Sequence, residues 1–127
     1  MELIVVMFSL LFSFAAFSAP ELKVIPMQDT YDQVNFGQVY VNSVRWASFK
    51  VWNSGDEPLF ISRVGIAGPM DFAAWYDCGT VIPVGGECMV DIRYWPNNPG
   101  HHTGTFIMNG VEDKWNLYIR LWGQAYH

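Results

Sequence analysis

Few side chains in this 127-residue chain have the type and spacing that catalysis or metal binding requires. His101 and His102 are adjacent, and neighbouring residues of a strand point to opposite faces, so the two imidazoles cannot readily hold one ion. They follow Pro99-Gly100, which indicates a polar loop. Four acidic residues show no evident pairing: Asp71, Asp77, Glu87 and Asp91.

The sequence lacks the nucleophile-elbow, dinucleotide-binding and zinc-protease motifs. We therefore predict that the chain is not an enzyme and that it holds no metal and no cofactor. The alternative is an active or inhibitory site on the loops, for example a carboxylate pair brought together from separate strands.

Cys78 and Cys88 stand ten residues apart and are the two cysteines of the chain. Two cysteines and scattered histidines are too few for a four-ligand zinc site. In an oxidising compartment an even cysteine count favours a disulfide, and the alternative is a pair of reduced thiols in the core. The spacing differs from Cys-x-x-Cys, which argues against a redox-active pair.

Residues 1–18 are predicted to be a signal peptide. The run Leu3–Phe17 is apolar apart from two serines, and it is shorter than the roughly 20 residues of a membrane-spanning helix. Small residues at Ala16 and Ser18 favour cleavage after Ser18. We expect an exported protein, in the periplasm, at the cell surface or secreted, without a stable membrane span once the signal is removed. The alternative is an uncleaved anchor, because Met1-Glu2 carries no basic side chain.

The composition limits the classes of partner. Apolar residues make up 51% of the chain and charged residues 15%, which argues against disorder. The formal net charge is −5, whereas a nucleic-acid-binding domain needs a basic stripe to neutralise phosphates. We therefore predict no nucleic-acid partner.

Short runs of β-branched and aromatic residues, separated by Gly, Asn and Pro, predict strands along most of the chain. These runs are Leu22–Ile25, Val34–Val41, Val44–Asn53, Leu59–Ile66, Thr80–Ile82, Cys88–Trp95, Thr103–Asn109 and Lys114–Trp122. Pro69–Tyr76 is compatible with one helical turn. Seven to eight short strands in about 100 residues favour an all-β fold, an immunoglobulin-like β-sandwich. Residues 19–30 then form a lead-in segment, and residues 31–127 form the domain.

Alternation along the strands separates a buried face from an exposed face. Asp91 and Arg93 mark the outer face of Cys88–Trp95, and Lys50 marks that of Val44–Asn53. The opposite faces contribute to the predicted core, which consists of Phe49, Val51, Leu59, Val90, Ile92, Tyr94, Phe106 and Leu121.

The same alternation places large aromatic side chains on outward faces, next to basic residues. Exposed apolar patches usually bind a partner, and Trp and Arg are the residue types most enriched at binding hot spots. The predicted binding face consists of Trp46, Lys50, Trp52, Phe60, Arg93, Trp95, Tyr118, Arg120 and Trp122. The alternative is that loops or the lead-in segment cover these rings.

An ordered series of short motifs runs from Val34 to Gly123. It consists of Val34-Asn35-Phe36-Gly37, Asn53-Ser54-Gly55-Asp56-Glu57-Pro58-Leu59, Ala67-Gly68-Pro69 with Phe72, Cys78, Pro83-Val84-Gly85-Gly86-Glu87-Cys88, Tyr94-Trp95-Pro96 with Gly100, Gly104-Thr105-Phe106 and Leu121-Trp122-Gly123. The series resembles the Hydin-like, ASH-type immunoglobulin-like domain, called choice-of-anchor D in bacterial surface proteins. Tyr94 stands where that pattern usually has Phe, and Trp95 stands where it commonly has a small or polar residue.

The resemblance implies a sandwich without an active site that serves in binding or structure, with cysteines at the positions of Cys78 and Cys88. In this pattern Gly37 allows a bend, and Asn53-x-Gly55 closes a hairpin. We therefore expect an exported, non-catalytic module that engages a protein partner through a sheet face or an edge strand. The alternative is a glycan-binding surface module that uses the outward-facing aromatic residues.

Overall fold

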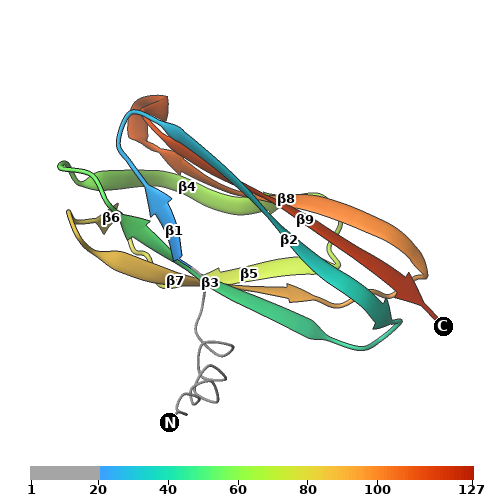
Figure 1. The fold of residues 1–127 in the computed structure, drawn as a ribbon. Helices are drawn as coiled ribbons and strands as arrows, with labels where there is room; N and C mark the ends of the chain where they lie inside the picture. The colour runs from blue at the N-terminus through green and yellow to red at the C-terminus, as the bar shows by residue number, and fades with distance from the viewer. Residues whose placement is uncertain (1–20) are drawn as a thin grey trace, which may run out of the picture.

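Nine strands in two sheets make up the described part of the chain, residues 21–127, in the computed structural model (Figure 1). The predicted signal peptide, residues 1–18, lies outside the described residues. The elements are β1 (Glu21–Val24), β2 (Asp29–Tyr40), β3 (Arg45–Asn53), β4 (Leu59–Ala67), β5 (Phe72–Tyr76), β6 (Val81–Ile82), β7 (Glu87–Tyr94), β8 (Gly100–Gly110), the short 3-10 helix η1 (Val111–Asp113) and β9 (Asn116–Tyr126).

The two sheets lie face to face (Figure 1). The buried apolar side chains of the core pack between them. One sheet has the strand order β1-β3-β7-β5, and the other has the order β2-β9-β8-β4-β6. This arrangement confirms the predicted all-β, immunoglobulin-like sandwich. Each predicted strand has a counterpart in the structure, and β5 is the additional one.

The helical turn considered for Pro69–Tyr76 is wrong, because Phe72–Tyr76 forms strand β5. β5 pairs antiparallel with β7, and the Phe72 ring is buried against Tyr94, with ring centroids 4.9 Å apart. Gly68, at φ +134°, turns the chain ahead of the strand. Local helix propensity is a weak preference, and the burial of an aromatic ring together with a hydrogen-bonded ladder outweighs it here.

The chain changes sheet between its first two strands. β1 pairs parallel with β3 at one edge of the four-stranded sheet, and β2 pairs parallel with β9 at one edge of the other. β1 falls within residues 19–30, the predicted lead-in segment. Gly37 has φ +75° at the point where the β2–β9 register shifts, so the expected bend at this residue is a β-bulge.

Asn53 ends β3, and its buried side chain organises the connection to β4. Its Nδ2 donates hydrogen bonds to the carbonyl oxygens of Glu57 at 2.8 Å and Ile82 at 3.0 Å, and its Oδ1 accepts one from the Gly55 amide at 3.0 Å. The expected hairpin at Asn53-x-Gly55 is wrong, because β3 and β4 belong to different sheets. The segment instead carries the chain across the sandwich.

The predicted core is confirmed, since all eight of its residues are buried: Phe49, Val51, Leu59, Val90, Ile92, Tyr94, Phe106 and Leu121. Phe49 from the four-stranded sheet meets Phe106 from the five-stranded sheet edge to face, with ring centroids 5.8 Å apart. Such aromatic pairs contribute about 0.5–1.5 kcal/mol beyond the burial of their area. The alternation of inward and outward side chains therefore follows the register expected from the sequence.

Candidate functional site

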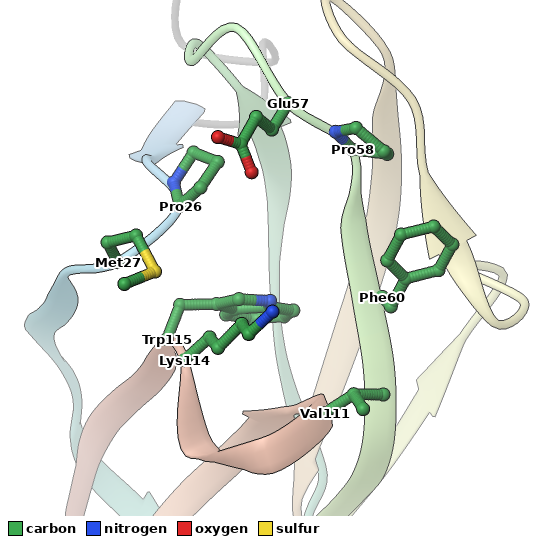
Figure 2. A pocket seen from close by; sticks show the side chains of 8 residues that line it. All are labelled: Pro26, Met27, Glu57, Pro58, Phe60, Val111, Lys114 and Trp115. Carbon is green, nitrogen blue, oxygen red and sulfur yellow. The ribbon is translucent and has the colours of Figure 1, made fainter.

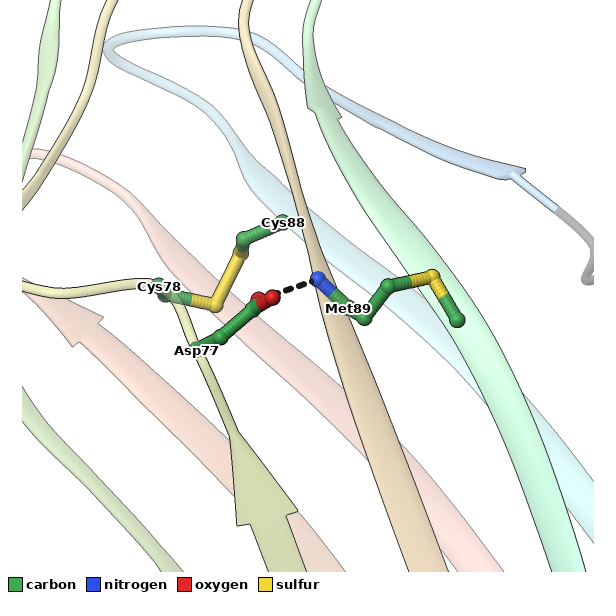
Figure 3. Close-up of a disulfide and its surroundings, with 4 residues drawn as sticks. All are labelled: Asp77, Cys78, Cys88 and Met89. Carbon is green, nitrogen blue, oxygen red and sulfur yellow. Dashed lines mark hydrogen bonds between the residues drawn. A yellow bond between two sulfur atoms is a disulfide. The ribbon is translucent and has the colours of Figure 1, made fainter.

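Cys78 and Cys88 form a disulfide that joins the segment after β5 to β7 (Figure 3). Their Cα atoms are 4.9 Å apart, and both residues are buried. Asp77 lies beside the bond, where its Oδ1 accepts a hydrogen bond from the Met89 amide at 2.7 Å. Because the two sulfurs are bonded to each other, they supply no thiolate with which Asp77 could hold a metal. The predicted pairing is confirmed, and it fixes the end of β5 against β7.

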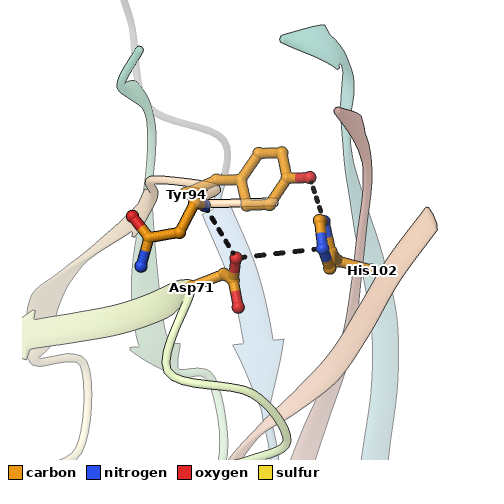
Figure 4. A network of polar contacts seen from close by, with 4 residues as sticks. Asp71, Tyr94 and His102 are labelled. Carbon is orange, nitrogen blue, oxygen red and sulfur yellow. Dashed lines mark hydrogen bonds and ion pairs between the residues drawn. The ribbon is translucent and has the colours of Figure 1, made fainter. Parts of the chain in front are cut away.

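Asp71, Tyr94 and His102 form a polar network between the sheets (Figure 4). The Tyr94 hydroxyl and His102 Nδ1 are hydrogen-bonded at 2.7 Å, and His102 Nε2 lies 3.9 Å from Asp71 Oδ2. Burial, and to a smaller extent the charge of Asp71, raises the pKa of Tyr94 to about 12. A buried hydroxyl that keeps its proton at neutral pH is a poor nucleophile or general base. The network ties the loop before β5 to β7 and β8.

His101 and His102 lie on strand β8, so the predicted polar loop is wrong. The β8–β9 ladder extends as far as Gly100, which pairs with Ala125, and this ladder overrides the local turn signal. As expected for adjacent strand residues, the two imidazoles separate. His102 turns toward Tyr94, whereas His101 is exposed, with its ring centroid 6.2 Å from that of Trp122.

The nine residues of the predicted binding face do not lie on one surface. β3 and β7 belong to the four-stranded sheet, whereas β4 and β9 belong to the five-stranded sheet on the opposite side of the sandwich. The first sheet carries Trp46, Lys50, Trp52 and Arg93, with Trp95 directly after β7, and the second carries Phe60, Tyr118, Arg120 and Trp122. The structure therefore distributes the predicted binding face over two opposite sheets.

On the four-stranded sheet, three tryptophans surround one arginine. The Arg93 guanidinium lies 5.1 Å from the ring centroid of Trp75 and 5.0 Å from that of Trp95, which are cation–π distances. The ring centroids of Trp46 and Trp75 are 5.4 Å apart. The indole–arginine cluster is the name used below for these four residues, Trp46, Trp75, Arg93 and Trp95. Their indoles remain open to solvent, with exposures of 54% for Trp46, 48% for Trp75 and 43% for Trp95.

Strand register builds this cluster. Trp46 on β3 and Ala73 on β5 both lie opposite Arg93 on β7. Trp75 follows two residues after Ala73, and because side chains alternate along a strand it shares the outward face. The small side chain of Ala73 separates Arg93 from the free edge of the sheet, so the guanidinium lies one strand from that edge.

Arg93 is a charged side chain of this surface that forms no ion pair within residues 21–127. Lys50 pairs with Glu87 at 3.5 Å, and Asp91 accepts a hydrogen bond from the Ser48 hydroxyl at 2.6 Å. Among residues 21–127, no carboxylate forms an ion pair with the Arg93 guanidinium. Its Nε is buried and has no hydrogen-bond partner. The cluster therefore presents an unpaired cation within a partly exposed apolar frame.

Trp52 lies on the same sheet but is less open than the cluster. Lys23 of β1 places its ammonium 5.6 Å from the Trp52 ring centroid. The lead-in segment thus partly covers this ring, as the alternative reading of the sequence allowed. The three indoles of the cluster stay exposed.

The five-stranded sheet carries a second aromatic surface. The rings of Tyr31 and Tyr118 stack with centroids 5.2 Å apart, and the Arg120 guanidinium lies 5.9 Å from the Trp122 ring centroid. A shallow groove of about 430 Å³ runs over these side chains. It is lined by Tyr31, Asp32, Gln33, Thr105, Tyr118, Arg120 and Trp122.

Phe60 lies apart from both surfaces, at the end of the sandwich near η1 (Figure 2). It borders a pocket of about 120 Å³ together with Pro26, Met27, Glu57, Pro58, Val111, Lys114 and Trp115. This volume is well below the roughly 300 Å³ at which small-molecule sites begin. The buried indole of Trp115 forms part of the pocket's lining.

Two aromatic residues of these surfaces were missed by the sequence analysis. Trp75 was missed because its segment was assigned to a helical turn, and Tyr31 because the strand was expected to begin at Val34. The short, continuous apolar run Phe72–Tyr76, with three aromatic residues in five, is the signal that could have indicated a strand containing Trp75. No comparable signal marks Tyr31, whose place depends on the pairing of β2 with β9.

No helix within residues 21–127 is long and apolar enough to cross a membrane. The fold nevertheless has clear relatives. A domain of human CEP192, described as ASH/PapD-like, superposes with a TM-score of 0.59 at 13% identity, covering 76% of this chain and 82% of that one. The VesB protease of Vibrio cholerae superposes with a TM-score of 0.59 at 16% identity, covering 73% of this chain and 30% of the protease.

The secreted serine protease VesC of Vibrio cholerae gives a TM-score of 0.58 at 16% identity. The superposition covers 72% of this chain but only 21% of VesC, so the chain corresponds to one part of each protease. At these identities the superpositions show a shared fold. No curated protein matches the chain in sequence.

Residues 26–124 match the family described as HYDIN/CFA65/VesB-like, Ig-like domain. The match spans β2 to β9 and includes the disulfide, the crossing at Asn53 and the strand that carries Arg93. It also agrees with the resemblance seen in the motif series. The chain therefore belongs to the HYDIN/CFA65/VesB-like family of immunoglobulin-like domains.

Proposed function

We propose that this chain is an exported, non-catalytic immunoglobulin-like module that binds a protein partner through the outer face of the four-stranded sheet. The observation that carries the proposal is the indole–arginine cluster. Three half-exposed indoles and an unpaired guanidinium are the groups most enriched at protein-binding hot spots. Their framework is rigid, because the disulfide and the β3–β7–β5 ladders hold it.

A non-catalytic role is supported by the site chemistry. The described cysteines are joined to each other, and the Tyr94 hydroxyl is buried with a raised pKa. Domains of this family are typically non-catalytic, and the chain corresponds to a minor part of the protease VesC. VesC is described as secreted, which supports export together with the predicted signal peptide and the disulfide.

The test is capture of a partner by the tagged protein from an extract of the envelope of the source cells. We expect a specific protein to be retained by the wild type and lost with Trp46→Ser or Trp75→Ser. Trp122→Ser is the matched control, because it removes a partly exposed indole from the opposite sheet. Loss of capture with Trp122→Ser alone would place the interaction on the other surface and refute the proposal.

Glycan binding is the second candidate function, and the groove on the five-stranded sheet favours it. Sugar rings stack on aromatic faces while polar side chains bind their hydroxyls. Tyr118 and Trp122 provide the rings there, and Gln33 and Thr105 provide polar groups. On a glycan array, binding that disappears with Trp122→Ala but survives Trp75→Ser would support this reading, and absence of binding would refute it.

A further inference from the structure

β5 differs from the other edge strands of the sandwich in having no protection against strand pairing. Natural sheet edges are protected by short length, charged residues or bulges. β6 has two residues, β1 carries Glu21 and Lys23, and β2 has a bulge near Gly37. β5 has five residues, Phe72–Tyr76, without a charge, a proline or a bulge. It is the unprotected edge among the described residues.

The free backbone groups of this edge can be assigned from the ladder. In the β5–β7 ladder, the Trp95 amide donates to the Asp71 carbonyl and the Asp77 amide donates to the Met89 carbonyl. Hydrogen-bonded pairs alternate along an antiparallel ladder. The backbone amides and carbonyls of the odd-numbered residues of β5 therefore point toward β7. The amide and carbonyl of Ala74 therefore point to the open edge, where no described strand pairs with them.

The same edge lies beside the unpaired charge of the indole–arginine cluster. A strand added next to β5 would lie two strand spacings, roughly 10 Å, from β7. Between the two lies Ala73, whose methyl group leaves the surface above Arg93 accessible from the added strand. A long acidic side chain reaching across Ala73 would meet the guanidinium, and Trp75 would pack on its stem. The free edge of β5 and the Arg93 guanidinium are thus close enough to contact the same bound segment.

We propose that the free edge of β5 binds an extended segment of a protein partner by strand addition, and that a carboxylate of this segment pairs with Arg93. The proposal rests on the proposed function and specifies the partner's chemistry. Main-chain hydrogen bonds to Ala74 supply affinity, and the carboxylate–guanidinium pair selects an acidic sequence. Charge complementarity at Arg93 favours this occupant over a second copy, because the β5 strand of a second copy, Phe72–Tyr76, contains no carboxylate to pair with the guanidinium.

The test uses a displayed library of random ten-residue peptides, selected on the purified protein. We expect the enriched peptides to contain Asp or Glu flanked by β-branched residues. Their affinity should fall about tenfold or more with Arg93→Gln, since one charge-assisted hydrogen bond is lost. Arg120→Gln is the matched control, because it removes an arginine that also stacks on an indole but lies on the other sheet.

Strand addition is tested separately from charge. Ala74→Pro removes the outward amide without breaking the β5–β7 ladder, and it should abolish peptide binding. If this variant fails to fold, the peptide itself is changed instead. Two versions of the peptide are compared, one N-methylated at its odd-numbered amides and the other at its even-numbered amides. The version whose methyl groups face β5 should no longer bind the wild-type protein, whereas the other version should bind as before.

Three results would overturn the proposal. They are enrichment of peptides without acidic residues, binding that survives both Ala74→Pro and peptide N-methylation, and self-association of the protein that Ala74→Pro abolishes. Such self-association would show that a second copy of this chain binds at the β5 edge. A partner from the capture experiment that is lost with Trp46→Ser but retained with Ala74→Pro would leave the proposed function standing and refute strand addition alone.

Discussion

Reduction of the Cys78–Cys88 disulfide should lower the free energy of unfolding by about 2.7 kcal/mol. The bond joins residues ten positions apart, and the entropy of closing a loop of that length in the unfolded chain gives this magnitude. The loss is large beside the 5–15 kcal/mol that stabilises a typical domain. The double variant Cys78→Ala/Cys88→Ala should lose somewhat more, because both sulfurs are buried and their removal leaves space in the core.

The assay is urea unfolding followed by tryptophan fluorescence, in which the buried Trp115 reports the loss of the core. Oxidised and reduced wild-type protein give the free-energy difference directly, and the reductant should leave the Cys78→Ala/Cys88→Ala variant unchanged. A difference below about 1 kcal/mol between the oxidised and reduced proteins would refute the reasoning. It would mean that the loop is already constrained in the unfolded state, or that the bond strains the native one.

Three further predictions concern processing, packing and pH. Intact-mass analysis of exported protein should give a chain that begins at Ala19 or Pro20, and a mass that retains residues 1–18 would contradict cleavage. Phe49→Ala and Phe106→Ala should each cost about 3–5 kcal/mol in urea unfolding, and losses below about 1 kcal/mol for both would contradict their contact across the sheets. Stability should fall as pH rises from 10 toward 12, because the unfolded chain releases the Tyr94 proton near pH 10 while the folded protein keeps it to about 12. Tyr94→Phe should flatten that decline in an alkaline unfolding series, and an unchanged slope would show that other groups cause it.

The sequence predicted most of the fold because alternation is a local property. Asp91 and Arg93 identified the outer face of one strand, and Lys50 identified that of another. The residues on the opposite faces were then predicted to be buried. Strand order is not local. Nothing along the chain shows that β9 and β7 lie in different sheets, so residues that all face outward were grouped on one surface. Trp75 was not predicted to lie on this surface for a related reason. Its strand, β5, is stabilised by pairing with β7, and that pairing cannot be seen in the local sequence.

The parallel pairing of β2 with β9 has a consequence for folding kinetics. It joins the beginning of the domain to its end, as in the hydrogen bond between Asn116 and Asp29, which are 87 positions apart. Contacts this distant in sequence make folding slow, with times of milliseconds to seconds typical of β-sandwiches, because a long loop must close before they stabilise the fold. We expect the five-stranded sheet to remain incomplete until β9 is available to pair with β2. The aromatic surface shared by Tyr31 and Tyr118 would then be among the last parts of the molecule to form.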